Sequence, residues 1–130
     1  MRKKAAFVLA SLLGLMSTPS SALTGNELNA QLTSSNAMEV TKAYNYIFGV
    51  FDAEEYYHFQ DMMILAISDK KNSHFTTPHF CTPKGMTNGQ AFDIIRKYFA
   101  TNPENRHLTA HGLIREALIE VFPCADNAPK

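Results

Sequence analysis

The sequence predicts an all-α fold, a small single-domain bundle of about four to five helices with one disulfide. Apolar residues recur at spacings of three and four through most of the chain, which is the period of a helix with one buried face. Two pairs of polar residues that precede apolar runs have the form of helix-capping boxes. The chain also has two cysteines, Cys81 and Cys124, which is enough for one cross-link.

The first 22 residues are expected to be a secretory signal peptide. Met1–Lys4 is positively charged, Ala5–Met16 is apolar but too short to span a bilayer, and Ser17–Ala22 is small and polar. Ala22 and the serine two positions before it fit the small-residue sites of a cleavage signal. We therefore expect cleavage after Ala22 and one mature domain, Leu23–Lys130.

The charge of the mature chain argues against nucleic-acid binding. Twelve Lys and Arg balance twelve Asp and Glu in the whole chain, but three of the basic residues lie within the expected signal peptide. The mature chain is therefore mildly acidic, and its basic residues are scattered. No long apolar run follows Ala22, so no membrane association is expected after cleavage. In a Gram-negative cell this places the protein in the periplasm.

Export would place both cysteines in an oxidising compartment, where an intramolecular Cys81–Cys124 disulfide is the expected state. Closing a loop of this length is worth about 4 kcal/mol in the chain-entropy model. The alternative is a nucleophilic Cys81 with His79 two residues away. That chemistry needs a free thiolate, which an oxidising compartment disfavours.

The first two helices follow from capping and periodicity. Thr24 with Glu27 forms a capping box, and a short helix is expected from there to about Leu32. Polar residues 34–36 then interrupt the pattern. A longer helix is expected from about Ala37 towards Ser68, with a kink near Gly49 and the aromatic-rich segment 54–59. Its buried face would comprise Val40, Ala43, Tyr44, Ile47, Val50 and Phe51.

A long loop, Asp69–Met86, is expected next because its residues lack an apolar period and include prolines and a glycine. Thr87 with Gln90 forms the second capping box and opens a helix that ends near Thr101. After a turn at Asn102-Pro103, Thr109 is expected to cap the last helix, which Pro123 ends. Since the cysteines would lie just before the third helix and just after the fourth, the disulfide would join the ends of a helical hairpin.

The C-terminal half carries a family resemblance in a series of residues that fall in order at the family's spacing. They are Phe80-Cys81-Thr82-Pro83-Lys84-Gly85-Met86-Thr87, Gln90, Lys97-Tyr98, Asn102-Pro103-Glu104, Arg106-His107, Ala117-Leu118 and Phe122-Pro123-Cys124. This pattern resembles the Rap/Tai family of immunity proteins against type VI secretion amidase effectors. The likeness covers about Gly25 to Cys124 and is looser in the N-terminal half.

The N-terminal half departs from the family in one respect. Residues 25–28 and 46–53 are similar to the family's opening and to its Gly-Tyr-Ile-x-Gly-Val segment. Family members often have a second cysteine pair, whose positions correspond to Leu32 and Ala43 in this chain. Both cysteines are replaced together, as expected when apolar contact takes over from a disulfide. The Pro, Gly, Asn and His residues of the shared motif are expected to determine the fold.

The resemblance implies a binding protein, not an enzyme, without a cofactor. Family members are helical, often dimeric, periplasmic proteins that cover the active-site cleft of a peptidoglycan amidase delivered by neighbouring cells. The implied partners are a cognate amidase effector and, as in dimeric members, a second copy of the chain.

Two segments have the character of a partner-binding element. One is the loop Asp69–His79 and the other is the expected bend Glu54–Phe59, since aromatic residues are favoured interface anchors. A solvated connector and core packing are their respective alternatives. The residues expected to contact the partner are Lys70, Lys71, His74 and Phe75 in the loop and Tyr56 and Tyr57 in the bend.

Metal and catalytic sites have weaker sequence support. His107 and His111 are four apart, but no Glu, Cys or third His accompanies them as a zinc site requires. Glu54-Glu55, with Asp52 and His58, resembles an acid/base cluster only superficially, because adjacent carboxylates on a helix point apart. We expect neither a metal nor a catalytic residue.

A second class of function stays open from the sequence. Small helical proteins with one disulfide include acid-activated periplasmic chaperones. The chain has five histidines, all in the expected mature part, and these would become charged near pH 5 to 6 and loosen a dimer. The motif pattern favours the immunity protein over this alternative.

Overall fold

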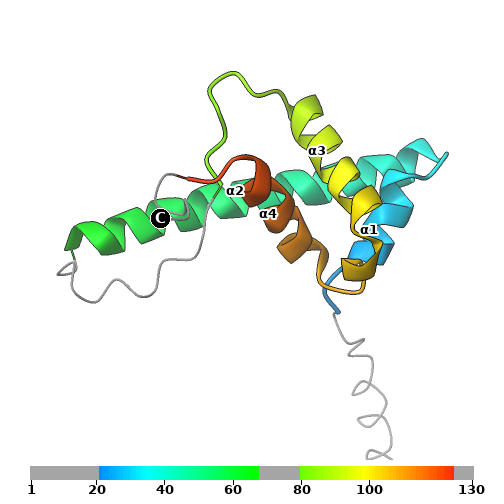
Figure 1. Ribbon diagram of the computed structural model, residues 1–130, viewed down its shortest axis with the longest axis horizontal. Helices are drawn as coiled ribbons and strands as arrows, with labels where there is room; N and C mark the ends of the chain where they lie inside the picture. Colours follow the sequence, from blue (N-terminus) through cyan, green and yellow to red (C-terminus); the bar gives the residue numbers. More distant parts are fainter. Residues whose placement is uncertain (1–20, 68–79, 125–130) are drawn as a thin grey trace, which may run out of the picture.

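The computed structural model describes residues 21–67 and 80–124, which form four α-helices and one short 3-10 helix (Figure 1). No β-strand occurs in these residues, only two isolated bridges. The prediction of a small all-α domain with one disulfide is confirmed. The elements are α1 (Gly25–Leu32), α2 (Ala37–Ile67), α3 (Asn88–Thr101), η2 (Pro103–Asn105) and α4 (Ala110–Val121).

Helix α1 begins at its predicted capping box. Thr24 Oγ1 accepts a hydrogen bond from the Glu27 N–H at 3.3 Å, and Glu27 Oε2 accepts one from the Thr24 N–H at 2.8 Å. The first residue, Gly25, lies against the segment before α4, where its N–H donates to Leu108 O at 2.8 Å. A Cβ at Gly25 would lie 2.9 Å from Arg106 O. Only glycine therefore permits this close approach of α1.

The two capping boxes of the chain differ in their response to pH. The backbone and side-chain hydrogen bonds from Thr24 lower the pKa of Glu27 below its usual 4.5. Because the folded-state pKa is depressed, this cap adds stability above the unfolded pKa, and that stability is lost as the pH falls through the folded pKa. In α3 the corresponding residue is Gln90, whose amide accepts from the Thr87 N–H at 2.8 Å and does not titrate.

Replacing Glu27 with glutamine should therefore keep the box and remove its pH dependence. We expect Glu27→Gln to lose less stability than the wild type between about pH 5 and pH 3. Urea denaturation at a series of pH values measures this difference, with Gln90→Glu as the converse variant that should gain acid sensitivity. Identical pH profiles for Glu27→Gln and the wild type would contradict the assignment.

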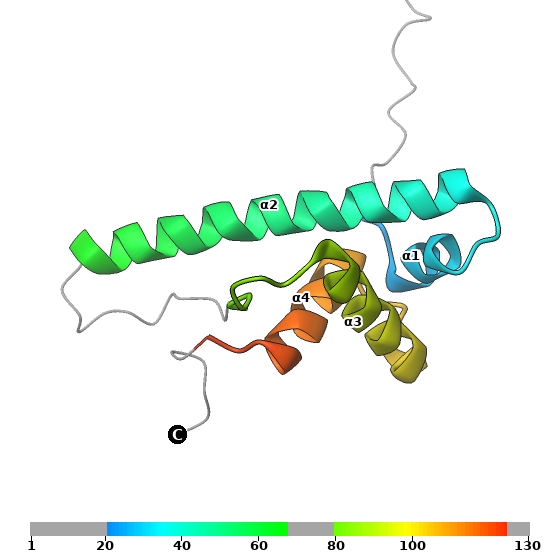
Figure 2. The same cartoon turned by 90° about the horizontal axis from the view of Figure 1, so that it is seen from above.

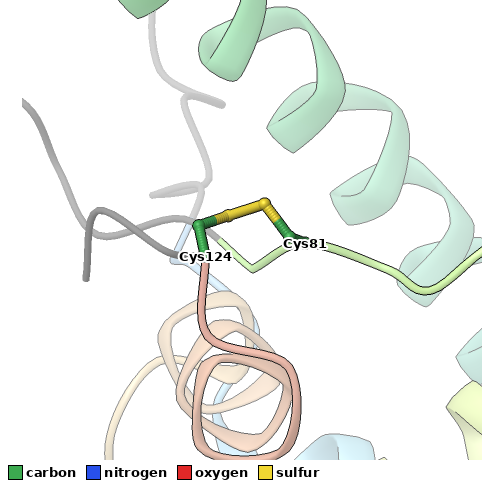
Figure 3. The surroundings of a disulfide bond; sticks show 2 residues. All are labelled: Cys81 and Cys124. Atoms are coloured by element: carbon green, nitrogen blue, oxygen red, sulfur yellow. A yellow bond between two sulfur atoms is a disulfide. The ribbon is translucent and has the colours of Figure 1, made fainter. Parts of the chain in front are cut away.

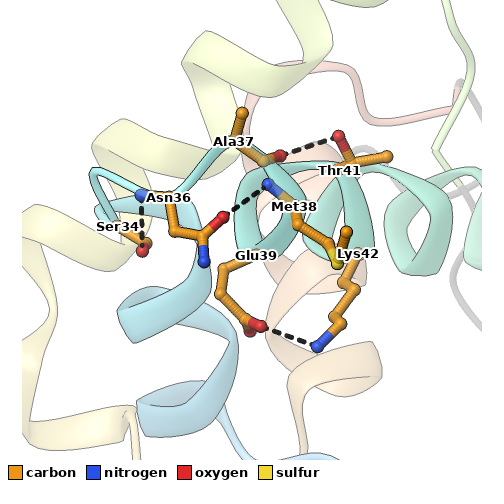
Figure 4. A network of polar contacts seen from close by, with 7 residues as sticks. All are labelled: Ser34, Asn36, Ala37, Met38, Glu39, Thr41 and Lys42. Carbon is orange, nitrogen blue, oxygen red and sulfur yellow. Dashed lines mark hydrogen bonds and ion pairs between the residues drawn. The ribbon is translucent and has the colours of Figure 1, made fainter.

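The turn between α1 and α2 is closed by short polar side chains (Figure 4). Asn36 Oδ1 accepts from the Met38 N–H at 2.9 Å, and the Asn36 N–H donates to Ser34 Oγ at 3.1 Å. Asn36 therefore caps the start of α2, a role that the sequence analysis did not assign to it. Near the start of α2, Lys42 Nζ lies 2.6 Å from Glu39 Oε1.

Helix α2 is continuous from Ala37 to Ile67, so the expected kink near residues 54–59 is wrong (Figure 2). The segment contains no proline, and one interior glycine costs only about 1 kcal/mol, which packing of the helix can offset. Ala43, Ile47 and Val50 supply that packing, being at most 8% exposed. Among residues 21–67 and 80–124, no helix is both long and apolar enough to cross a membrane.

Helices α3 and α4 form the predicted hairpin, with η2 in the turn. Asn102 Nδ2 donates to Tyr98 O at 3.0 Å at the end of α3. Across the hairpin, the Tyr98 hydroxyl donates to Glu116 Oε2 at 2.9 Å. Thr109 occupies the N-cap of α4, but its side chain makes no capping hydrogen bond, contrary to expectation. Instead, the Ala110 N–H donates to Leu23 O at 2.7 Å, so the chain before α1 satisfies the start of α4.

The core lies where α1, α3 and α4 pack against the first half of α2. Leu32 and Ala43, the positions that correspond to the second cysteine pair of the family, are 5% and 0% exposed within one cluster. Buried apolar side chains of the core therefore stand at both positions. The other members of the cluster are Leu28, Ile47, Val50, Phe92, Ile95, Phe99, Ala110, Leu113, Ile114, Ala117 and Leu118.

The predicted Cys81–Cys124 disulfide is present and joins the outer ends of the hairpin (Figure 3). The two Cα atoms are 4.9 Å apart across a sequence separation of 43. Backbone pairing accompanies the bond, because the Cys81 N–H donates to Phe122 O at 2.8 Å and Phe80 bridges Pro123. Phe80 and Cys81 are therefore joined to the chain that follows α4.

Candidate partner-binding surface

The outer half of α2 carries large exposed apolar side chains. Val50 and Glu54 are the last buried residues of this helix among those whose side chains the structure describes. From Glu55 to Ile67 the helix continues beyond the other helices in both views (Figures 1 and 2). We call Glu55–Ile67 the α2 arm. Its exposed large side chains, each at least half exposed, are Tyr56, Tyr57, Phe59, Met62, Met63, Ile64 and Ile67.

The length of the α2 arm makes its exposure unusual. At 1.5 Å per residue the arm extends roughly 20 Å. Isolated helices of this size are only marginally stable in water, and most helical stability in proteins comes from packing of an apolar face. Exposed apolar patches of this kind mark interaction sites in soluble proteins.

Two hollows flank α2 where the arm begins. The first, which we call the disulfide groove, has a volume of about 510 Å³ between α2 and the segment that follows Phe80. Its lining includes Phe51, Glu55, His58 and Cys81. The second, which we call the glycine groove, has a volume of about 570 Å³ between α2 and α4. It is lined by Asn45, Tyr46, Gly49, Val50, Ala53, Glu54, Tyr57 and His111.

Tyr46 connects the two walls of the glycine groove. Burial raises the pKa of the Tyr46 hydroxyl, and a hydrogen bond with the backbone of His111 opposes that rise. The side chain on α2 therefore reaches the first turn of α4.

An ion pair also connects α2 and α4. Arg115 Nε on α4 lies 2.8 Å from Glu54 Oε1 on α2, and the two side chains are 23% and 10% exposed. Glu54 lies one helical turn after Val50, so a carboxylate occupies the next position of the core face. The pair joins α2 to α4 between the two grooves.

The charges of the outer part of α2 have one sign. After Lys42 the helix contains no lysine or arginine up to Ile67. The same stretch contains four carboxylates, of which Glu54 is paired with Arg115. The four are Asp52, Glu54, Glu55 and Asp61.

The family comparison spans almost all of this described structure. The family model of Rap1a immunity proteins matches residues 24–124, which include all four helices and both cysteines. The chain belongs to the Rap1a immunity protein family. Comparison with curated proteins found no match, and comparison with solved structures found none either. Rap1a membership makes the chain an immunity protein against a secreted effector, and it implies binding of that cognate effector.

The predicted contact residues of this Rap1a protein fall into two groups. Lys70, Lys71, His74 and Phe75, with the whole loop Asp69–His79, lie outside the described residues. Tyr56 and Tyr57 lie on the α2 arm, 58% and 57% exposed, with ring centroids 6.0 Å apart. The two tyrosines are therefore not core residues, and their rings are accessible to a partner.

The residues considered for metal binding or catalysis are separated or already paired in this Rap1a protein. His107 Nδ1 lies 2.8 Å from Glu104 O, whereas His111 lines the glycine groove. Within residues 21–67 and 80–124, no three His, Cys, Asp or Glu side chains gather to hold a metal ion. Glu54 is paired with Arg115, whereas Asp52 and Glu55 are exposed.

Proposed function

We propose that the chain is a periplasmic immunity protein that binds a type VI secreted peptidoglycan amidase and inhibits it by covering the active-site cleft. The observation that carries this proposal is the family match over residues 24–124. The Cys81–Cys124 disulfide supports a location in an oxidising compartment. The proposed signal peptide, residues 1–22, supplies the route of export.

Inhibition at one inhibitor chain per active site requires a stable complex with the amidase. A stable complex of standard size buries roughly 1,600 Å² in total, and a few anchors supply most of the binding energy. We propose the loop Asp69–His79 as the element that enters the cleft, since the Cys81 cross-link follows it directly and such constraints lower the entropy lost on binding. The exposed Tyr56 and Tyr57 offer anchors beside it.

Titration of amidase activity tests the proposal. Purified, oxidised Leu23–Lys130 is added to a purified type VI peptidoglycan amidase, and release of peptide from peptidoglycan is measured. We expect inhibition that is complete at one inhibitor chain per active site. Alanine at Lys70, Lys71, His74 and Phe75 together should weaken inhibition at least tenfold, while circular dichroism shows intact helices.

Export provides the control in cells. Co-expression of the full chain should protect a Gram-negative host from the amidase directed to its periplasm, whereas Leu23–Lys130 without residues 1–22 should not. Failure of the wild-type protein to bind any type VI amidase at micromolar concentration would refute the proposed function.

One observation favours the chaperone alternative, namely the exposed Phe59, Met62 and Met63 on the α2 arm. Flexible methionine side chains suit the binding of varied apolar clients. The two functions differ in their response to acid. An immunity protein should not prevent aggregation of an unfolding client at pH 5, whereas an acid-activated chaperone should.

A further inference from the structure

No contact among the described residues requires the glycine in the glycine groove. Gly49 lies in the interior of α2, where glycine costs about 0.5–1 kcal/mol relative to alanine. Within residues 21–67 and 80–124, and apart from the backbone of its own helix, a Cβ at this position would meet no atom within 4 Å. Internal packing therefore does not require the glycine, and its effect is to leave the helix backbone open at the floor of the groove.

The walls of this groove have the character of a binding site for an apolar side chain. Tyr46 and Tyr57 come from α2 and His111 from α4, and the small Ala53 lies one turn after Gly49. A volume of about 570 Å³ accommodates one or two large side chains of a partner. Tyr57 belongs both to this groove and to the α2 arm, so the two form one continuous surface.

The charge of this surface indicates what covers it. Between Lys42 and the end of the helix, α2 has four carboxylates and no basic residue. Two copies joined arm to arm would bring like charges together, which disfavours that contact. A partner with basic side chains would instead be attracted to these carboxylates. That attraction would orient the partner so that its apolar side chains meet those of the α2 arm.

We propose that the α2 arm and the glycine groove bind a basic segment of the amidase effector, with one apolar side chain of that segment inserted over Gly49. The inference rests on the proposed function and adds a second contact surface to the loop Asp69–His79. This loop begins two residues after the arm ends, so one partner is able to contact both.

Two substitutions of glycine form a matched test. Gly49→Leu fills the groove, whereas Gly89→Leu places the same side chain on the first turn of α3, where the nearest atom to a Cβ is Thr87 Oγ1 at 3.8 Å. The probe is the purified amidase whose binding to the wild-type protein has been measured by calorimetry. We expect Gly49→Leu to weaken binding about tenfold to a hundredfold without lowering the melting temperature, and Gly89→Leu to change neither.

Charge reversal tests the electrostatic part. Asp52→Lys with Glu55→Lys, which reverses two exposed acids of α2, should weaken binding at low salt, and the affinity of the wild type should fall as salt is raised. Glu104→Lys, an exposed acid in η2 outside both grooves, is the control and should leave binding nearly unchanged.

The outcomes separate this inference from the proposed function. If the wild type binds the amidase and Gly49→Leu and the charge reversals bind it equally well, the surface is wrong and the function stands. If the wild type is a dimer by sedimentation and Gly49→Leu makes it monomeric without affecting the amidase, a second copy occupies the surface and the inference is also refuted. If the wild type binds no amidase, the proposed function itself fails.

Discussion

Removing the Cys81–Cys124 disulfide is expected to lower the free energy of unfolding by about 4 kcal/mol. The bond closes a sequence separation of 43 that contains α3, η2 and α4, and without it the unfolded chain gains the entropy of that open loop. Such a loss is a large part of the stability of a domain of this size. Guanidinium denaturation of Cys81→Ala/Cys124→Ala against the oxidised wild type measures it.

The reduced wild type is the control for this variant. It should unfold at the same denaturant concentration as Cys81→Ala/Cys124→Ala, since both lack the covalent link. A loss below about 1 kcal/mol would show that backbone pairing alone holds Phe80 and Cys81, through the bond of Cys81 N–H to Phe122 O and the bridge of Phe80 to Pro123. The chain around Cys81, which lines the disulfide groove, would then keep its position without the disulfide.

Helix starts were predictable from the sequence wherever the capping signal is local. The two capping boxes, Thr24 with Glu27 and Thr87 with Gln90, form all their hydrogen bonds between residues three apart. A motif of four consecutive residues is therefore enough to specify each helix start. Thr109 offered the same kind of signal, but the N–H of the following residue bonds to Leu23 O, far away in the sequence. A tertiary contact therefore satisfies the start of α4, and no local sequence pattern predicts that contact.

The continuity of α2 was harder to predict because it depends on what lies beside the helix. Gly49 and the aromatic residues after it resemble a bend when only local propensity is considered. Other helices supply the contacts of this part of α2. Ile47 and Val50 pack in the shared core, and Glu54 pairs with Arg115 on α4. These contacts hold the helix as far as Glu54, the first residue of the segment where the sequence predicted a kink.

The candidate surface was only partly predictable. Tyr56 and Tyr57 stood out as adjacent aromatic residues, whereas the glycine groove needs His111 from α4 and was missed. One signal in the sequence was available. Glu54 continues the helical spacing of Ala43, Ile47 and Val50, so a carboxylate on an apolar face already implied a buried partner.

Truncating Arg115 to alanine is expected to lower the free energy of unfolding by about 2–3 kcal/mol. The substitution leaves the Glu54 carboxylate, whose side chain is 10% exposed, without its partner at 2.8 Å. Loss of one member of a fully buried pair costs about 3–5 kcal/mol, and the 23% exposure of Arg115 places this site below that range. Urea denaturation at pH 7 measures the loss.

A double-mutant cycle isolates the contribution of the pair. Because Glu54→Ala/Arg115→Ala leaves no buried charge behind, its cost should be smaller than the sum of the two single costs by about 1–2 kcal/mol. The exposed pair Glu39 and Lys42, whose side chains are 35% and 56% exposed, is the matched control and should give a coupling below about 0.5 kcal/mol. Additive costs for Glu54 and Arg115 would mean that the ion pair does not join α2 to α4, and that the apolar core alone positions the two walls of the glycine groove.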